Sequence, residues 1–428
     1  MGLWLIIFFV FFLLIGVPIA VTLGITCLAA AVVTGNIGSE VLVQKMFNVA
    51  NTFELMAIPF FILAGNIMAS GGVSKRLVDL AATLFGRFNG GLALVATLAS
   101  TFFGAVSGSA PATTAAIGGV MLKPMAEKGY DKNFAGAVVA ASGTIGLIIP
   151  PSLTMVLYGV STNTSIGDLF MAGFIPGVII CIALMTVEYA ISVKRGYRGD
   201  EKPTWGAALH AFINAFWALL MPVIILGGIY TGVFTPSESA AVSVVYGVIV
   251  GLFIYREITF RELPALILKS AKSTALLMYL MITAEVLGYV LVSEQIPQSI
   301  AGMILNISSN ANVVILIMIV ILLFVGTFMN NSAAMVLLAP IFYPIILGLN
   351  VNPVFFGIIM VISLAIGHNT PPVGLCLFIA CDIGNIKLEG LVKQIVPLVL
   401  TMIAVVIVLS FLPGVITFLP EVLKAWNQ

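Results

Sequence analysis

Two stretches in the first half of the chain combine small residues, hydroxyl groups and prolines in a way that suits cation binding. Residues 106–114 read VSGSAPATT, and residues 142–152 read SGTIGLIIPPS. A helix break frees carbonyl oxygens, and small residues let two backbones approach closely. Sodium binds such unwound carbonyls. The first stretch therefore indicates a cation site or a tight helix contact, and the second indicates a broken helix or a simple kink.

Two stretches in the second half offer amide groups where the first half offers hydroxyls. Residues 326–333 read GTFMNNSA, and residues 366–374 read IGHNTPPVG. If all four stretches are helix breaks, the helices that follow them direct the positive ends of their dipoles at one cavity near the bilayer midplane. His368 in the last stretch either contacts a substrate or is a satisfied polar residue at the break.

The composition indicates that the solvent around these breaks is a bilayer. Of 428 residues, 61% are apolar and only 8% are charged, and the mean hydropathy is +1.19. A soluble domain carries about 25% charged residues, so this chain has too few to cover a soluble surface. The formal net charge of +1 favours no nucleic acid. The four cysteines have no framework spacing and predict no transition-metal site or disulfide.

Hydropathy divides the chain into full spans and two interrupted stretches. About 20 apolar residues cross the hydrocarbon core. The interrupted stretches, about 89–123 and 312–343, are broken in the middle by small and polar residues and predict re-entrant helical hairpins, because such breaks need a protein-buried or wet cavity. The expected spans are about 4–33, with Pro18 as a candidate kink, 51–70, 133–162, 169–193, 210–231, 237–255, 273–293, 354–382 and 391–412.

The placement of basic residues orients these spans. If the N-terminus lies in the cytoplasm, all of the 18 Lys and Arg residues except Lys45 and Lys424 face the cytoplasm. This bias agrees with the positive-inside rule. The C-terminus is then periplasmic, and the two hairpins open to opposite sides.

The two halves are related in sequence. Several glycines and prolines recur at a nearly constant offset, 220 residues for the first pair and 221 for the others: Pro124 and Pro344, Gly136 and Gly357, Gly146 and Gly367, Pro150-Pro151 and Pro371-Pro372. This predicts an all-α membrane protein built from two inverted-topology repeats. The first repeat is 1–193, with a hairpin and a broken helix at about 133–162. A polar linker follows at 194–209, and the second repeat is 210–428, with its broken helix at about 354–382.

Charged side chains inside the spans are scarce. No Lys or Arg lies in the middle of a predicted span, so a bound anion needs helix N-termini, neutral donors and co-bound cations, which favours sodium coupling. Glu238 after Thr235 suits the first turn of a helix. Glu285 is either a buried structural partner or a transport residue, whereas Asp382 and Glu54 lie near span ends, where solvated faces are expected.

Several motifs, in order, resemble the large membrane subunit of tripartite ATP-independent periplasmic (TRAP) transporters. They are SGSAPATTAAIG at 107–118, ASGTIGLIIPPS at 141–152, GGIYTGVFTPSESAAV at 227–242 and TPPVG at 370–374. The resemblance implies an elevator, in which a transport region carrying both hairpins slides against a scaffold. It also implies residues that bind sodium: Ser107, Gly108, Ser109 and Ala110 with Gly143, Thr144 and Gly146, and Gly326, Thr327 and Asn330 with Gly367, Asn369 and Thr370. A substrate between the hairpin tips is expected to contact Ser109, Pro111, Thr113, Pro150, Asn331, Ser332, His368 and Pro371.

The same resemblance implies a function and partners. The expected function is sodium-coupled import of a small organic anion, such as a C4-dicarboxylate, a sialic acid or a related carboxylate, across the bacterial inner membrane. The expected partners are a small membrane subunit of about four helices and a soluble periplasmic substrate-binding protein, and sodium is the co-transported ion with no organic cofactor. An ion-coupled carrier of another anion that works without a binding protein is the main alternative. A channel would need a continuous pore, and an intramembrane hydrolase would need Ser107 or Ser109 to meet His210 or His368.

Overall fold

The computed structural model describes residues 2–35, 37–199, 203–296, 299, 302 and 310–426, and these are helical with no strand. Eight helical segments of the described chain have the length and composition of membrane spans: Phe53–Ser70, Lys132–Thr162, Ile166–Arg195, Trp205–Tyr230, Pro236–Ile254, Leu263–Ser293, Asn331–Gly348 and Leu388–Ser410. The predicted polytopic all-α fold is therefore confirmed.

The helices of the first half run in the order α1 (Gly2–Leu14), α2 (Ile19–Thr34), α3 (Ser39–Ala50), η1 (Phe53–Met56), α4 (Ala57–Ser70), α5 (Val73–Phe85), α6 (Gly91–Ser107), α7 (Ala110–Glu127), α8 (Lys132–Gly143), α9 (Ile145–Ile148), α10 (Leu153–Thr162) and α11 (Ile166–Arg195). Those of the second half are α12 (Trp205–Tyr230), α13 (Pro236–Ile249), the π-helix η2 (Val250–Ile254), α14 (Leu263–Ser293), α16 (Ala311–Gly326), α17 (Asn331–Gly348), α18 (Pro353–Gly367), α19 (Leu375–Gly384), α20 (Leu388–Ser410) and α21 (Pro413–Trp426).

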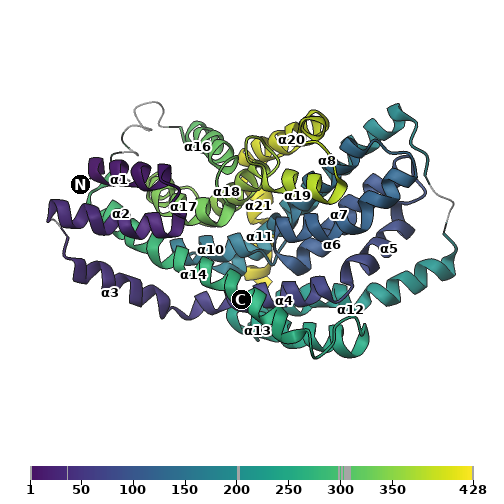
Figure 1. The fold of residues 1–428 in the computed structure, drawn as a ribbon, viewed down its shortest axis with the longest axis horizontal. Helices are drawn as coiled ribbons and strands as arrows, with labels where there is room; N and C mark the ends of the chain where they lie inside the picture. The colour runs from purple at the N-terminus through teal and green to yellow at the C-terminus, as the bar shows by residue number, and fades with distance from the viewer. Residues whose placement is uncertain are drawn as a thin grey trace.

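The N-terminal segment differs from its prediction as one span over 4–33. It forms two helices, α1 of 13 residues and α2 of 16, which pack against each other on either side of Gly16 and Pro18 (Figure 1). At about 1.5 Å per residue each reaches only ~20–24 Å, less than the ~30 Å hydrocarbon core. Hydropathy did not separate the two forms because both are apolar throughout. The predicted cytoplasmic N-terminus, which depended on a single crossing here, loses that support.

The first half contains the predicted hairpin, formed by α6 and α7. Helix α6 ends at Ser107, and Gly108 turns the chain with a φ of +61°, a left-handed conformation that favours glycine. Ser109 then caps α7, and its side-chain oxygen accepts a hydrogen bond from the Ala112 N–H at 3.5 Å. Pro111 lies in the first turn, where its missing N–H costs no helix hydrogen bond.

The next segment is the predicted broken helix. Helices α8, α9 and α10 follow one another, and the interruption after Ile148 contains the Pro150-Pro151 pair, whose peptide bond is cis. Prolines remove backbone donors, so the helix cannot continue through this pair. The most apolar 18-residue window of this segment is entirely buried inside the protein, as a broken helix at membrane depth requires.

The second half repeats this plan. Helices α16 and α17 form the other hairpin, and Asn330 caps α17 by accepting a hydrogen bond from the Ser332 N–H at 2.9 Å. Helices α18 and α19 form the other broken helix, with the cis Pro371-Pro372 pair between them.

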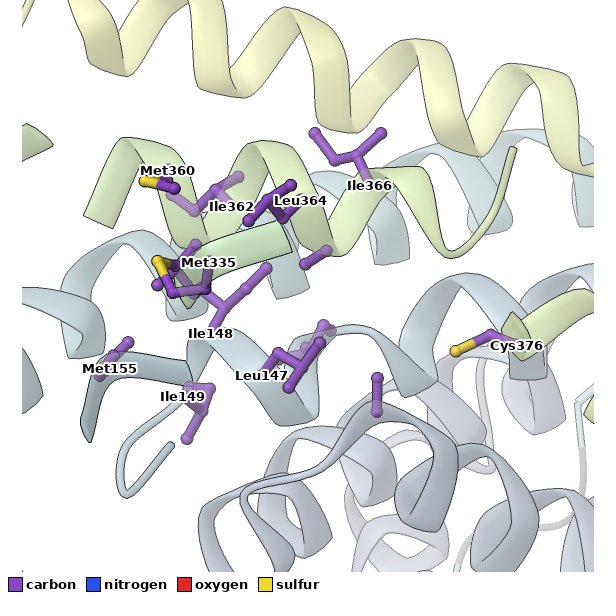
Figure 2. Close-up of a cluster of buried hydrophobic side chains, with 14 of the residues drawn as sticks. Leu147, Ile148, Ile149, Met155, Met335, Met360, Ile362, Leu364, Ile366 and Cys376 are labelled. Atoms are coloured by element: carbon purple, nitrogen blue, oxygen red, sulfur yellow. The ribbon is translucent and has the colours of Figure 1, made fainter. Parts of the chain in front are cut away.

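The halves interlock. Helix α7 of the first hairpin packs against α19, and α17 of the second hairpin packs against α10, so each hairpin contacts the broken helix of the other half (Figure 1). The apolar core between them includes Ile148 on one side and Met335, Met360 and Leu364 on the other, all buried (Figure 2). This core holds the two hairpin tips near each other.

Candidate functional site

A cavity of about 300 Å³ lies where the hairpin tips meet. Its walls come from both hairpins, both broken helices, and two helices outside them, α4 and α14. The lining residues include none of the charged types. Polar groups are supplied by Asn66, Ser107, Ser109, Ser273, Asn330, Asn331, Ser332 and His368.

Two of these polar side chains are buried and lack hydrogen-bond partners among the described residues. Asn331 is 2% exposed and His368 is 3% exposed, and neither amide atom of Asn331 and neither ring nitrogen of His368 is paired. Buried polar groups in folded proteins are nearly always paired, so two unpaired side chains that line the same cavity point to a ligand.

The first hairpin is seated on its own broken helix through a contact that only glycine allows. A Cβ on Gly104 would lie 2.7 Å from Cα of Gly146, and a Cβ on Gly146 would lie 2.4 Å from Oγ1 of Thr113. A second contact joins the same two elements, because the Leu153 N–H donates to the Gly108 carbonyl at 3.4 Å. The close approach brings main-chain and hydroxyl oxygens together beside the cavity.

The hydroxyls at this tip form a small cluster. The Ser107 and Thr113 hydroxyl oxygens are 2.8 Å apart, and a Cβ on Gly146 would also lie 3.0 Å from the Ser109 carbonyl oxygen. Oxygens of this kind are the ligands that sodium uses in broken-helix sites. The structure thus brings together Ser107, Ser109 and Gly146 of the first predicted sodium set.

The second hairpin is seated in the same way. A Cβ on Gly367 would lie 2.3 Å from the backbone carbon of Gly326, and the Thr327 carbonyl accepts a hydrogen bond from the Val373 N–H at 3.1 Å. The structure therefore brings Gly326, Thr327 and Gly367 of the second predicted sodium set together.

One hydrogen bond joins the broken helices of the two halves. The Asn369 Nδ2 donates to the Thr144 Oγ1 at 3.3 Å, and both residues are buried. Thr144 Oγ1 itself donates to the Ala141 carbonyl at 2.6 Å. These two predicted sodium residues therefore contact each other across the two halves, although they were assigned to separate ions.

The predicted residues divide into cavity wall and supporting layer. Lining the cavity are Ser107, Gly108, Ser109, Pro111, Asn330, Asn331, Ser332 and His368, and Pro151 lines it where Pro150 was predicted. Outside the lining are Ala110, Thr113, Gly143, Thr144, Gly146, Pro150, Gly326, Thr327, Gly367, Asn369, Thr370 and Pro371.

Sequence reasoning missed the walls from α4 and α14. Asn66 donates through Nδ2 to the Ser270 hydroxyl at 2.9 Å, and Ser273 and Leu277 lie on the same helix as Ser270. An asparagine inside the apolar segment 57–70 was the one local signal. The wall from α14 has no comparable signal, because its lining residues depend on which face the tertiary fold turns to the hairpins.

The intramembrane acidic residues fall into three kinds. Glu238 forms a capping box with Thr235, as its sequence predicted. Asp382 and Glu54 are exposed, as expected near span ends, and Glu285 is also exposed in this chain taken alone. Glu188 on α11, which sequence reasoning overlooked, is fully buried, and both of its oxygens lie 2.8 Å from the Thr97 hydroxyl. The rule that intramembrane acids are significant would have found it.

A second cavity, of about 740 Å³, lies away from the hairpin tips. Its walls include Thr52, Asn163 and Tyr230, and Lys424 and Asp168 pair across it at 2.6 Å. Sequence reasoning predicted no site here.

The family model for the tripartite ATP-independent periplasmic transporter DctM component matches residues 5–415. The chain belongs to this family. The family and its relatives are transporter permeases, so the chain is not an enzyme and the hydrolase alternative is excluded. The recognition made from the motifs is confirmed.

Relatives of known type are similar over most of this permease. It is 44% identical to the isethionate TRAP transporter permease protein DctMQ of Oleidesulfovibrio alaskensis over 96% of this chain, and it spans 65% of that protein's length. It is 40% identical to the C4-dicarboxylate large permease protein DctM of Pseudomonas aeruginosa over 88% of each chain. It is 37% identical to the sialic acid large permease protein SiaM of Vibrio cholerae over 96% of this chain and 97% of that one.

The fold of this permease is similar to a solved structure. The crystal structure of the Alcanivorax borkumensis YdaH transporter matches with a TM-score of 0.61 and 15% identity, covering 87% of this chain and 86% of that chain. At this identity the likeness concerns the fold alone.

Proposed function

We propose that this permease imports a small organic anion together with sodium, and that the anion binds in the cavity between the hairpin tips. The unpaired Asn331 and His368 side chains on the cavity wall carry the proposal. Relatives are permeases for isethionate, C4-dicarboxylates and sialic acid, all of which are organic anions. The substrate of this permease is one of these or a related carboxylate or sulfonate.

The cavity suits an anion although no cationic side chain lines it. Helices α7 and α17 begin at its wall, with Ser109 and Asn330 as their caps. A helix N-terminus is equivalent to about half a positive charge, so these two together offset roughly one negative charge. Neutral hydroxyl and amide donors supply directional hydrogen bonds, and co-bound sodium supplies the remaining charge.

The two glycine contacts support sodium sites on either side of the anion. In each half a hairpin carbonyl and a broken-helix backbone approach so closely that a side chain would collide. Sodium bound there would offset the negative charge of the anion. Sodium and the anion would therefore each bind more weakly when the other is absent. This coupling lets the sodium gradient drive uptake of the anion.

An elevator motion explains why the cavity has walls of two kinds. The hairpins and broken helices interlock and move as one transport region, whereas α4 and α14 form part of the scaffold beside it. Sliding this region would carry the cavity from one side of the membrane to the other while Asn66 and Ser273 stay behind.

The permease works with two partners in the inner membrane and periplasm. About a third of the relative named DctMQ lies outside the part that this chain matches, which supports a small membrane subunit as a partner. A periplasmic binding protein would deliver the anion. The basic residues favour a periplasmic C-terminus.

Uptake by proteoliposomes that contain the permease, its small subunit and the binding protein tests this function. Replacing external sodium with potassium is expected to reduce uptake to background, because no Lys or Arg side chain lines the cavity to replace the ion. Undiminished uptake in potassium contradicts the coupling. Liposomes with the permease alone are the control, and sustained import by them supports the carrier that needs no binding protein.

A further inference from the structure

The cavity between the hairpin tips offers unpaired hydrogen-bond acceptors as well as unpaired donors. Asn331 lies in the first turn of α17, His368 lies directly after α18, and both residues line the cavity. Their four polar atoms, Nδ2 and Oδ1 of Asn331 and Nδ1 and Nε2 of His368, are buried and have no partner within the described ranges.

The chemistry of these two side chains fixes what an occupant must supply. An asparagine amide has two N–H donors and one acceptor oxygen, and turning the amide over does not change this inventory. A neutral imidazole has one donor and one acceptor. A ligand that satisfies the wall therefore needs acceptors for the N–H groups and at least one donor for the Asn331 Oδ1.

An unsubstituted dicarboxylate fails this requirement. Two ionised carboxylates accept hydrogen bonds and donate none. Such a ligand would fill the cavity and still leave Asn331 Oδ1 buried without a partner, which is the condition that makes a site reject an analogue. The volume of about 300 Å³ is at the small end for ligand pockets.

We propose that the substrate is a small oxyanion, sulfonate or carboxylate, that also carries a hydroxyl or N–H donor, and that Asn331 and His368 recognise this donor. The inference rests on the proposed function, because it assigns the ligand of the same cavity. It separates hydroxylated anions from dicarboxylates such as succinate that lack a donor.

Matched ligands test the donor directly. Binding of isethionate and of 1-propanesulfonate, in which a methyl group replaces the hydroxyl, is measured by calorimetry on the purified permease assembled with its small subunit, in saturating sodium chloride and again in potassium chloride. Malate and succinate form a second pair that differs by one hydroxyl. The hydroxylated member of at least one pair is expected to bind at least about tenfold more tightly than its partner.

Two variants locate the recognition. Asn331→Leu and His368→Phe are expected to bring the ratio of the two affinities close to one, because they remove the acceptors. Asn312→Leu is the matched control on exposed α16 surface and is expected to keep the ratio. Thermal melting of each variant shows whether it is folded, and the wild-type ratios do not depend on the variants.

The outcomes separate this inference from the function. Equal affinities within both wild-type pairs, or a ratio that survives both substitutions, overturns the recognition of a donor while leaving anion binding in place. If Asn331→Leu removes the sodium dependence of binding and leaves the ratio unchanged, Asn331 is a cation ligand and the inference is wrong. Failure of all four ligands to bind overturns the substrate cavity and this inference together.

Discussion

Replacing Gly367 with alanine tests the close contact that seats the second hairpin. A Cβ on Gly367 would lie 2.3 Å from the Gly326 carbonyl carbon and 2.6 Å from its oxygen. Carbon atoms pack best at about 3.5–4.0 Å, so the added methyl group lies at least ~1 Å too close to main-chain atoms. Backbone cannot rotate away as a flexible side chain can, so α16 and α18 must separate.

The cost follows from that separation. Overpacking of a buried contact costs about 1–3 kcal/mol. The Thr327–Val373 hydrogen bond beside Gly367 would lengthen from 3.1 Å, which puts a further ~0.5–1.5 kcal/mol at risk. We expect Gly367→Ala to lower the free energy of unfolding by about 1–4 kcal/mol and to weaken sodium binding, because the hairpin carbonyl moves away from the broken helix.

Gly119→Ala is the matched control. Gly119 is exposed within α7, and a Cβ there would meet nothing within 4 Å. Alanine is about 1 kcal/mol better than glycine in a helix, so the control is expected to be unchanged or slightly more stable. Thermal melting of the purified proteins and sodium titration of substrate binding are the assays. Equal melting temperatures and sodium affinities for Gly367→Ala and wild type would refute the close contact.

Three further substitutions have defined outcomes. Ser109→Leu is expected to abolish uptake in proteoliposomes while costing only about the ~1 kcal/mol of a lost helix cap, and wild-type uptake would remove Ser109 from the site. Asn369→Ala removes the hydrogen bond between the broken helices and is expected to lower the free energy of unfolding by ~0.5–1.5 kcal/mol in denaturant melts. An unchanged free energy of unfolding would show that this hydrogen bond does not stabilise the fold. Thr97→Val leaves the buried Glu188 carboxyl without its hydroxyl partner and is expected to cost ~1–3 kcal/mol, whereas Thr186→Val on an exposed face of the same helix as Glu188 should cost less; equal melting of the two variants would contradict this.

The parts of the site that came from local sequence were predicted well. The recurrence of Gly146 as Gly367, and of one Pro-Pro pair as another, predicted helix breaks in both halves, because these residue types act on the backbone wherever they occur. The structure has both breaks, and both glycines lie at main-chain contacts.

The parts that depend on tertiary packing were not predicted. Asn66 and Ser273 are more than two hundred residues apart in the chain, and only the packing of α4 and α14 against the hairpins brings them to one cavity. The N-terminal pair α1 and α2 was taken for one span because hydropathy does not distinguish a kinked helix from two short helices that pack together.

A structure of the assembled transporter with sodium and a hydroxylated anion such as isethionate would show which cavity holds the substrate. We expect ligand density in the cavity between Ser109 and Asn331, with cation density beside Gly146 or Gly367. Ligand density confined to the larger cavity beside Lys424, with the space between the hairpin tips empty, would contradict this expectation.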